Sequence, residues 1–489
     1  MAKTNNSGGD GAPPSFWRRV SARPLTGRRL LAAAAVLHVA LAFGLYFAGR
    51  AQVAPGLVDR DGIMGSFAFD SYEYQRGAVR LAGVLKREGV ARWAAEPQPV
   101  HVRLLSVLFA VVGPLSGYGT LSAEPFNLLC YLAVVGLTLA LGREVGGPRA
   151  GLFAAAAVAL WPTFLLHTLQ LLKDPLFIAG ALALVLCVTT WLTRTYGPAA
   201  AAGAAALIGL TTLLLLLIRL NFAVVILALV LAGAGLLIAR QIAERRLLYW
   251  NMAPPALILA SGAAASLLLL FSPPPAQKFK HYPSDGGGRP KTEVFKGELM
   301  ASALTYRASA TAEARKAQGP AGRLMARADR LARRVGSVRY RFSAFYSQAG
   351  SGIDRDVRFD DLRSLLLYLP RAFQIGWWAP FPNMWAGAGR RVGGAGKLLS
   401  GVETLAIYLV ELLALAAALL PPRRLAAWLL LGVTVFGVTG LGLVIPNVGA
   451  LFRFRYTFWV LLIVLGAKGF ESLLAWRGAA RRAGAAQAG

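Results

Sequence analysis

The sequence predicts an all-α, polytopic membrane protein with about ten transmembrane helices. Hydrophobic residues make up 56% of its 489 residues and charged residues only 15%, and the mean hydropathy is +0.53. The apolar residues gather in runs of the length that crosses a bilayer as a helix, about 20 residues. This composition excludes a soluble globular domain, a disordered chain and a fibrous repeat.

The charge balance fits the same class of protein. The 52 Lys and Arg residues outnumber the 23 Asp and Glu residues, for a formal net charge of +29. A nucleic-acid-binding protein can carry such a charge, but not with this apolar content, so we expect no nucleic-acid partner. The two cysteines, Cys130 and Cys187, both lie in apolar runs and predict neither a disulfide framework nor a zinc site. The Arg-, Ala- and Gly-rich usage is typical of a bacterial protein.

The N-terminal segment predicts the orientation of the first helix. Residues 1–28 are rich in Gly, Pro, Ser and Arg, which is typical of a disordered tail. Several arginines precede the apolar run 30–49, and Arg50 follows it without a small-residue cleavage site. We therefore predict a retained first helix whose N-terminus is cytoplasmic.

The remaining spans follow from the other long apolar runs, which cover residues 125–142, 150–169, 175–193, 199–218, 222–239, 248–272, 401–420, 425–445 and 457–475. A shorter run, 102–117, is interrupted by Gly113-Pro114. If it crossed the membrane, the arginines of every short loop would face outside, against the positive-inside rule. We therefore predict that it is re-entrant or interfacial, that ten helices span a bacterial cytoplasmic membrane, and that both termini are cytoplasmic.

This topology divides the chain into five parts. They are the tail 1–28, an N-terminal transmembrane core 29–272 that includes the first external loop 50–124, a second external loop 273–400, C-terminal helices 401–476 and the tail 477–489. The sequence has no convincing internal repeat, which weakens the case for an inverted-repeat transporter.

The first external loop holds the candidate catalytic acids. Asp70 begins the stretch Asp70-Ser71-Tyr72-Glu73-Tyr74, which opens a predicted amphipathic helix at the membrane surface. A carboxylate in this place can cap the first turn of the helix. It can also act as a general base toward a hydroxyl group at the membrane boundary. The two roles are compatible.

External basic residues form the second candidate group. Lys173-Asp174 interrupts an apolar stretch, Arg219 stands in a tight external turn, and Arg453 and Arg455 precede the last helix. They are external in the predicted topology, where short loops are usually poor in arginine. Lys173 can simply snorkel to the interface, and the arginines can touch lipid headgroups. Convergence of these side chains would instead form a phosphate or diphosphate site.

The second external loop is mixed in character. Residues 300–345 predict one or two amphipathic helices with an arginine-rich face. The acidic stretch 351–361 lacks the Ca²⁺-loop pattern, so no metal site is predicted there. The stretch 377–385 is aromatic and proline-stiffened, and indicates either an interfacial aromatic belt or a platform for an acceptor or a lipid chain. The platform residues we select are Tyr74, Arg371, Trp377, Trp378 and Trp385.

Other chemistries find no support. The motifs of phosphate-binding loops, dinucleotide folds, serine hydrolases and zinc proteases are absent from the sequence. His101 and His167 are too isolated along the chain to be expected as ligands.

The order of these features resembles the GT-C superfamily of membrane glycosyltransferases, in particular the bacterial dolichyl-phosphate-mannose-mannosyltransferase-like (family 39-like) group. The matching features span about residues 30–240 and 450–475. They are the acid-aromatic stretch 70–74, the proline-flanked segment 97–113, Gly-Arg at 142–143 before Gly-Gly-Pro-Arg at 146–149, Trp161-Pro162, Lys173-Asp174, Arg219 and Arg-Phe-Arg-Tyr at 453–456. Residues 273–400 match no family domain.

The resemblance implies an inverting transfer of a sugar from a polyprenyl-phosphate donor to a hydroxyl acceptor on the external face, in cell-envelope or polysaccharide biosynthesis. The acceptor would be a glycolipid, a polysaccharide or a protein. Asp70 matches the family's base, with Glu73 in reserve, while Asp59 and Asp61 match its more usual spacing. Lys173, Arg219 and Arg455 would neutralise the departing phosphate. Members of the family differ in their use of a divalent cation, and the sequence leaves that open.

Three other functions stay open at this point. An O-antigen or exopolysaccharide polymerase or ligase would place its key residues around Arg339–Arg371. A lipid-linked-sugar transporter or flippase belongs to another class, as does a non-catalytic membrane scaffold, in which the external acids would be dispensable.

Overall fold

The computed structural model describes residues 26–65, 67–194, 197–219, 223–244, 256, 260, 319–345, 350–386, 393–420 and 425–488. Within them the secondary structure is helical, apart from one isolated bridge. Eight helices are long and apolar enough to cross a membrane, or nine if one bent pair counts as a single span. The predicted all-α polytopic fold is thereby confirmed. Residues 1–25 of the predicted tail 1–28 and the predicted span 248–272, except residues 256 and 260, fall outside the described residues.

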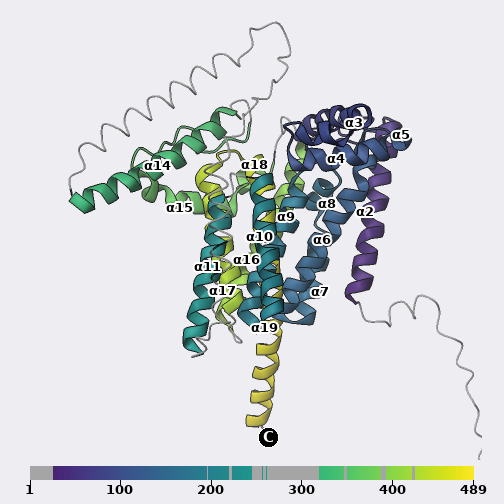
Figure 1. Ribbon diagram of the computed structural model, residues 1–489. Helices are drawn as coiled ribbons and strands as arrows, with labels where there is room; N and C mark the ends of the chain where they lie inside the picture. Colours follow the sequence, from purple (N-terminus) through teal and green to yellow (C-terminus); the bar gives the residue numbers. More distant parts are fainter. Residues whose placement is uncertain are drawn as a thin grey trace, which may run out of the picture.

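The eight spanning helices form the bundle in Figure 1. They are α2 (Gly27–Arg50), α6 (Thr120–Gly146), α9 (Asp174–Thr193), α10 (Pro198–Ile218), α11 (Ala223–Ala243), α16 (Gly393–Leu419), α17 (Leu425–Val444) and α19 (Tyr456–Ala488). Each has at least 20 residues, enough to cross a hydrocarbon core of about 30 Å at about 1.5 Å per residue.

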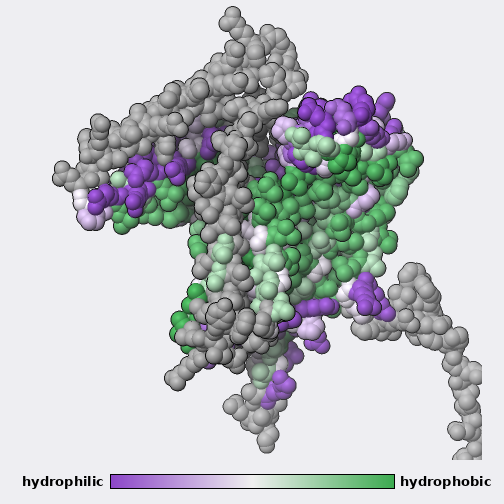
Figure 2. All heavy atoms as spheres, in the orientation of Figure 1, coloured by the Kyte–Doolittle hydropathy of each residue, from purple (hydrophilic) through white to green (hydrophobic). Residues whose placement is uncertain are grey.

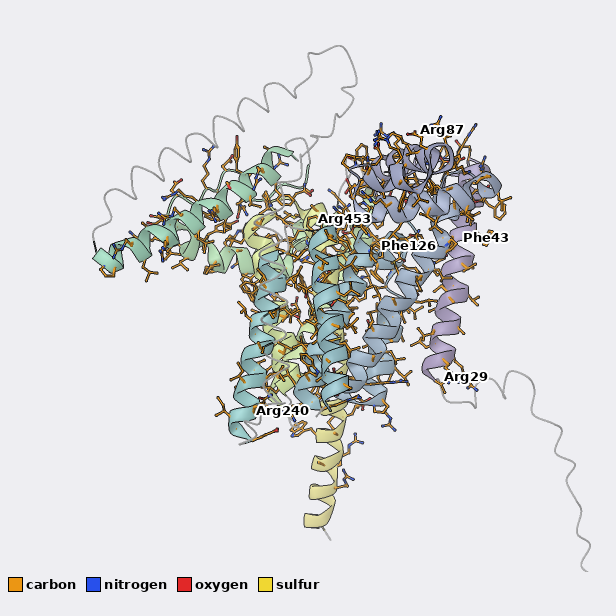
Figure 3. The ribbon with its side chains drawn as sticks, in the orientation of Figure 1. Arg29, Phe43, Arg87, Phe126, Arg240 and Arg453 are labelled. Atoms are coloured by element: carbon orange, nitrogen blue, oxygen red, sulfur yellow. The ribbon has the colours of Figure 1, made fainter. Side chains whose placement is uncertain are left out.

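Arginines mark one end of this bundle. The start of α2 and the end of α19 lie at the same end in Figure 1, and Figure 3 places Arg29 and Arg240 there. Arg240 donates to the carbonyl oxygens of Trp191 (3.0 Å) and Arg194 (3.4 Å), which joins two of the predicted cytoplasmic loops. Arg453 lies at the opposite end, which we call the external end after the predicted orientation.

The predicted span 150–169 is not one continuous helix. The chain instead forms α7 (Pro148–Ala159) and α8 (Pro162–Thr168), which are bent by 67°. Pro162 has no N–H and is suited to the first position of a new helix. Glu403 of α16 then accepts hydrogen bonds from the backbone N–H (2.8 Å) and the hydroxyl of Thr163. A carboxylate from another helix therefore satisfies the first turn of α8 and stabilises the bend.

Three helices of the first external loop cover the external end: α3 (Asp70–Ala95), α4 (Val100–Val111) and α5 (Gly113–Ser116). The 12-residue α4 is too short to span, as the prediction of a non-crossing segment requires. A small apolar core attaches these helices to the bundle, while Figure 2 shows a hydrophilic outer surface over α3. The core residues are Ile63, Ala78, Ala82, Val102, Leu105, Phe109, Ala123 and Leu171.

The second external loop supplies α14 (Gly319–Phe345), α15 (Leu362–Trp378) and the short helix η2 (Pro382–Met384). Figure 1 shows α14 and α15 projecting sideways at the external end, and α14 falls within the region predicted to be amphipathic. Close backbone approach holds α15 against α17, because a Cβ added at Gly442 would lie 2.0 Å from the carbonyl oxygen of Ala372. The seven-residue helix α18 (Val448–Phe454) precedes α19.

Candidate active site

Asp70 and Arg453 meet at the external end of the bundle. Asp70 is the first residue of α3, and Arg453 lies in α18. Arg453 Nη2 donates to Asp70 Oδ2 at 2.8 Å, and the two side chains are only 14% and 19% exposed. The capping role considered for Asp70 is wrong, because the N-cap position of α3 is Phe69 and makes no side-chain cap bond. The carboxylate binds an arginine instead.

Asp174 joins this pair to a second arginine. Asp174 begins α9, and its Oδ1 accepts a hydrogen bond from Arg219 Nη2 and lies 3.5 Å from Arg453 Nε. The Arg219 guanidinium also stacks 4.4 Å from the centre of the Phe454 ring. With Asp174 and Arg219 side chains 5% and 6% exposed, their mutual attraction offsets the cost of burying both charges. In the sequence, Asp174 stands out only as part of a charged break and has no predicted role.

Lys173 adds a third cation. Burial, followed by the charge of Arg219, lowers the pKa of Lys173 to about 8. The Asp174 and Asp70 carboxylates partly oppose this shift. Of the predicted external cationic set, Lys173 adjoins Asp174 as the N-cap of α9, and Arg219 and Arg453 contact the carboxylates of Asp174 and Asp70. We call these five residues the ionic cluster. Its three cations outnumber its two carboxylates, which favours binding of an anion.

Arg455 does not join the ionic cluster. Its fully buried guanidinium donates to the carbonyl oxygens of Gly376 (2.7 Å), Trp377 (3.4 Å) and Ala379 at the end of α15. The last carbonyls of a helix lack partners within the helix and favour a cation. The phosphate-binding role predicted for Arg455 is therefore replaced by a role in holding α15.

The other candidate bases of the first loop lie in different surroundings. Asp59 accepts hydrogen bonds from the backbone N–H groups of Asp61 (2.9 Å) and Ile63 (2.8 Å), which closes a local turn. Asp61 accepts a bond from the Gln75 amide at 2.8 Å. Glu73 is exposed on α3. Of these four carboxylates, Asp70 is the one in contact with Arg453.

The predicted platform residues divide into two groups. Tyr74 faces the ionic cluster, where burial and then the Asp70 charge raise its pKa above the ordinary range. The three tryptophans belong to the second external loop itself. Trp377 is buried, and Trp378 is 40% exposed. Trp385 Nε1 donates to the Pro380 carbonyl oxygen at 2.7 Å. The structure therefore places the aromatic stretch 377–385 around the end of α15.

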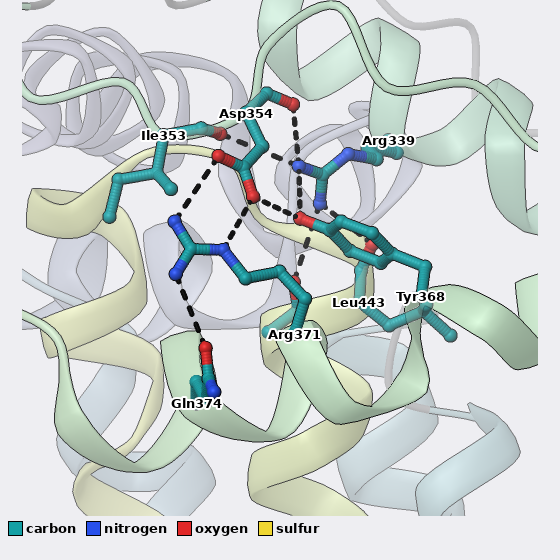
Figure 4. Close-up of polar contacts among 8 residues, drawn as sticks. Arg339, Ile353, Asp354, Tyr368, Arg371, Gln374 and Leu443 are labelled. Atoms are coloured by element: carbon teal, nitrogen blue, oxygen red, sulfur yellow. Dashed lines mark hydrogen bonds and ion pairs between the residues drawn. The ribbon is translucent and has the colours of Figure 1, made fainter.

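Arg371 and Arg339 belong to a separate network, drawn in Figure 4. Arg371 Nε donates to Asp354 Oδ2 at 2.9 Å, and the Tyr368 hydroxyl donates to the same oxygen at 3.0 Å. The fully buried Arg339 donates to the carbonyl oxygens of Leu443 (3.0 Å) and Asp354 (2.7 Å). This network docks the second external segment on the end of α17. From the sequence, Arg339 is a candidate only for the polymerase or ligase function.

The segment that carries Asp354 is also paired with the chain leading into α18. Ile353 N donates to the Pro446 carbonyl oxygen at 2.8 Å, and Val448 N donates to the Ser351 carbonyl oxygen at 2.9 Å. Asn447 then caps α18 by accepting a bond from Ala450 N at 2.9 Å. These contacts fix the helix that presents Arg453.

The donor set does not fit a divalent cation. Among the described residues, no three His, Cys, Asp or Glu side chains come together as ligands. Asp70 and Asp174 are both paired with arginines, whose charges would repel a metal ion. The steps derived below therefore use side chains alone.

No protein-family model matches this chain, and no curated protein sequence matches it. Among solved structures, the crystal structure of ArnT from Cupriavidus metallidurans bound to undecaprenyl phosphate is similar. The TM-score is 0.32 and the sequence identity 14%, over 90% of this chain and 77% of that chain. A similarity of this size assigns neither a family nor a substrate to the chain.

Proposed function

We propose that the protein is an integral-membrane glycosyltransferase that moves a sugar from a polyprenyl-phosphate donor to a hydroxyl acceptor at the external face of the membrane. One observation carries the proposal: a carboxylate in the first loop, Asp70, is paired with Arg453, and Asp174 links Arg453 to Arg219, next to Lys173, at the end of the helical bundle. Base and phosphate-binding groups are the two parts that this reaction requires of a protein.

The cations are suited to the leaving group. As the bond between the anomeric carbon and the phosphate oxygen breaks, negative charge builds up on the polyprenyl phosphate. Arg219, held by Asp174, is in place before the substrate arrives and stabilises that charge without moving, while Lys173 and Arg453 add positive charge beside it. The lipid chain of such a donor would lie among the apolar spans next to the cluster.

The carboxylate is suited to the acceptor. Its hydroxyl oxygen attacks the anomeric carbon from the face opposite the phosphate, and its proton passes to Asp70. One carbon–oxygen bond forms and one breaks, so the sugar is transferred with inversion. Because Arg453 binds Asp70 in this structure, a donor phosphate that draws Arg453 toward itself would expose the carboxylate to the acceptor.

The rival functions draw less support from the contacts. A polymerase or ligase centred on Arg339–Arg371 would use arginines that are here bonded to backbone carbonyls, Tyr368 and Asp354. A transporter or flippase gives Asp70 no chemical task, and a scaffold requires none of the five charged residues of the cluster.

Replacing Arg453 with Gln tests the proposal. In purified protein supplied with labelled polyprenyl-phosphate sugars, we expect kcat/KM for the donor to fall roughly 10- to 100-fold, because charge-assisted hydrogen bonds to the phosphate are lost. Arg363, exposed on α15, provides the matched control as Arg363→Gln, which should transfer like the wild type.

Two results would contradict this. Loss of transfer on Arg371→Gln with full activity in Arg453→Gln would favour the polymerase or ligase. Failure of the wild type to transfer from any of the polyprenyl-phosphate sugars would overturn the proposal itself.

The pKa of Lys173 predicts a pH dependence. Lys173 is cationic below its pKa of about 8 and neutral above it, whereas a phosphodiester keeps its negative charge throughout this range. We expect kcat/KM for the donor to be highest below about pH 8 and to fall as the pH rises through this value. Once the charge-assisted hydrogen bond from Lys173 is lost completely, the fall should reach roughly 10- to 100-fold. The measurement is a pH–rate profile at subsaturating donor. Lys173→Arg keeps its positive charge, so in this variant kcat/KM should no longer fall above about pH 8. If kcat/KM of the variant falls as in the wild type, another group titrates.

A further inference from the structure

His101 is a buried polar side chain that the mechanism above does not use. It is the second residue of α4 and is 2% exposed. Neither Nδ1 nor Nε2 has a hydrogen-bond partner among the described residues. Leaving a buried polar atom unpaired costs about 1–3 kcal/mol. Such groups are uncommon in native proteins and are often completed by a ligand or a water molecule.

The surroundings of His101 direct it toward the candidate active site. Its ring packs edge to face against Tyr74, with 4.4 Å between the ring centres and 81° between the planes. The charges that act on His101 are those of Lys173, Asp174, Arg219 and Asp70, four members of the ionic cluster. The charges of Asp70, Asp174, Arg453 and Arg219 act on the pKa of Tyr74. Tyr74 lies one helical turn after Asp70 on α3, so the two rings lie next to the Asp70 end of the ionic cluster.

The protonation state limits what His101 can bind. Burial, followed by the charge of Lys173, lowers its pKa to about 3, so the imidazole is neutral at physiological pH. It is therefore not a fourth cation for a phosphate. A neutral imidazole presents one N–H donor and one nitrogen acceptor. An alcohol hydroxyl, which also donates once and accepts, is the matching ligand.

We infer that His101, positioned by Tyr74, is a sugar-hydroxyl subsite of the candidate active site. This inference rests on the proposed glycosyltransferase function and adds a residue that selects the sugar. A buried site that hydrogen-bonds a substrate hydroxyl rejects the analogue that lacks it, because its own polar atoms are then left unpaired. The hydroxyl belongs to the donor sugar or to a carbohydrate acceptor, since both carry the same group.

Two variants separate the ring from its nitrogens. His101→Phe keeps an aromatic ring against Tyr74 and removes both nitrogens, and His101→Gln restores one donor and one acceptor. The full-length protein in nanodiscs would be titrated with polyprenyl phosphate and with polyprenyl-phosphate mannose, glucose and arabinose. Monodeoxy forms of the sugar that binds best would follow. Transfer assays with monodeoxy acceptor glycosides would test the acceptor side.

We expect His101→Phe to bind polyprenyl phosphate as the wild type does and to bind the sugar-bearing lipid roughly 10- to 100-fold more weakly, by the loss of one or two buried hydrogen bonds. It should also lose the wild-type discrimination against one particular deoxy form, and His101→Gln should recover part of it. Discrimination lost toward a deoxy donor assigns the subsite to the donor sugar. Discrimination lost toward a deoxy acceptor assigns it to the acceptor.

Equal discrimination by the wild type and His101→Phe toward every deoxy donor and acceptor would overturn the inference and leave His101 with a water molecule at most. A melting temperature of His101→Phe at or above that of the wild type would exclude misfolding as the cause of a loss, since phenylalanine removes two unpaired polar atoms. If the wild type binds no polyprenyl phosphate, the proposed function itself fails, which is a different result from selective loss of sugar binding.

Discussion

Replacing Asp70 with Asn is expected to lower kcat for sugar transfer by roughly 10²–10⁴-fold, the usual contribution of a general base. The amide cannot accept the proton of the acceptor hydroxyl. It is nearly isosteric with the carboxylate, however, and its oxygen can still accept the bond from Arg453 Nη2. The loss should therefore appear in kcat, while binding of polyprenyl phosphate and the melting temperature stay close to those of the wild type.

Two variants on the same helix sharpen this test. Glu88 is exposed on α3 and pairs with Arg92, so Glu88→Gln removes one negative charge away from the cluster and should transfer at the wild-type rate. Glu73→Gln tests the reserve base. Full activity of Asp70→Asn, combined with loss in Glu73→Gln, Asp59→Asn or Asp61→Asn, would move the base to another residue of the first loop.

The second large effect is expected for the buried pair of Asp174 and Arg219. Asp174→Asn removes the carboxylate charge that pairs with the buried Arg219, and breaking a buried pair in this way costs about 3–5 kcal/mol. Arg219→Met leaves Asp174 with Arg453, at 3.5 Å, and with the adjacent Lys173, and should also destabilise the protein. The double variant should cost clearly less than the sum of the single variants. Equilibrium unfolding in mixed micelles of a mild detergent and SDS measures all three.

An exposed ion pair provides the reference for this double-mutant cycle. Arg80 and Glu96 contact each other at 3.0 Å, with the arginine side chain 58% exposed, so their coupling should be only about 0.2–1 kcal/mol. Strictly additive single variants at Asp174 and Arg219 would show that the two charges are solvated separately, contrary to their burial. The double variant should stay deficient in donor binding even where its stability recovers, because it still lacks one phosphate-binding cation.

Two signals in the sequence predict most of the fold. They are the lengths of the apolar runs and the side of the membrane on which the arginines of the short loops lie. The long apolar helices and the short α4 follow from these two signals. The bend between α7 and α8 does not, because Trp161-Pro162 allows either a kink or a helix end. The choice depends on Glu403, which lies 240 residues away in the chain. A contact of that kind leaves no local signal.

The candidate site shows the same limit. Lys173, Arg219 and Arg453 could be selected because they are external basic residues in short turns, where few are expected. Arg455 satisfies the same criterion and yet binds the carbonyls at the end of α15, since neighbouring positions around a helix end point in different directions. Asp174 is noticeable in the sequence only as part of a charged break, and His101 is too isolated along the chain to be expected as a ligand. Their importance lies in burial and in the charges that surround them.

The seven-residue helix α18 connects the first and second external loops, which are far apart in sequence. Arg453 holds the first loop through Asp70, Arg455 directly after α18 holds α15, and Val448 is paired with the segment that carries Asp354. The positions of the first and second external loops are therefore coupled. Neither loop can shift without moving α18 or breaking one of these bonds. Opening the site to a bulky acceptor and releasing the used lipid would then be a single coordinated motion of the whole external end.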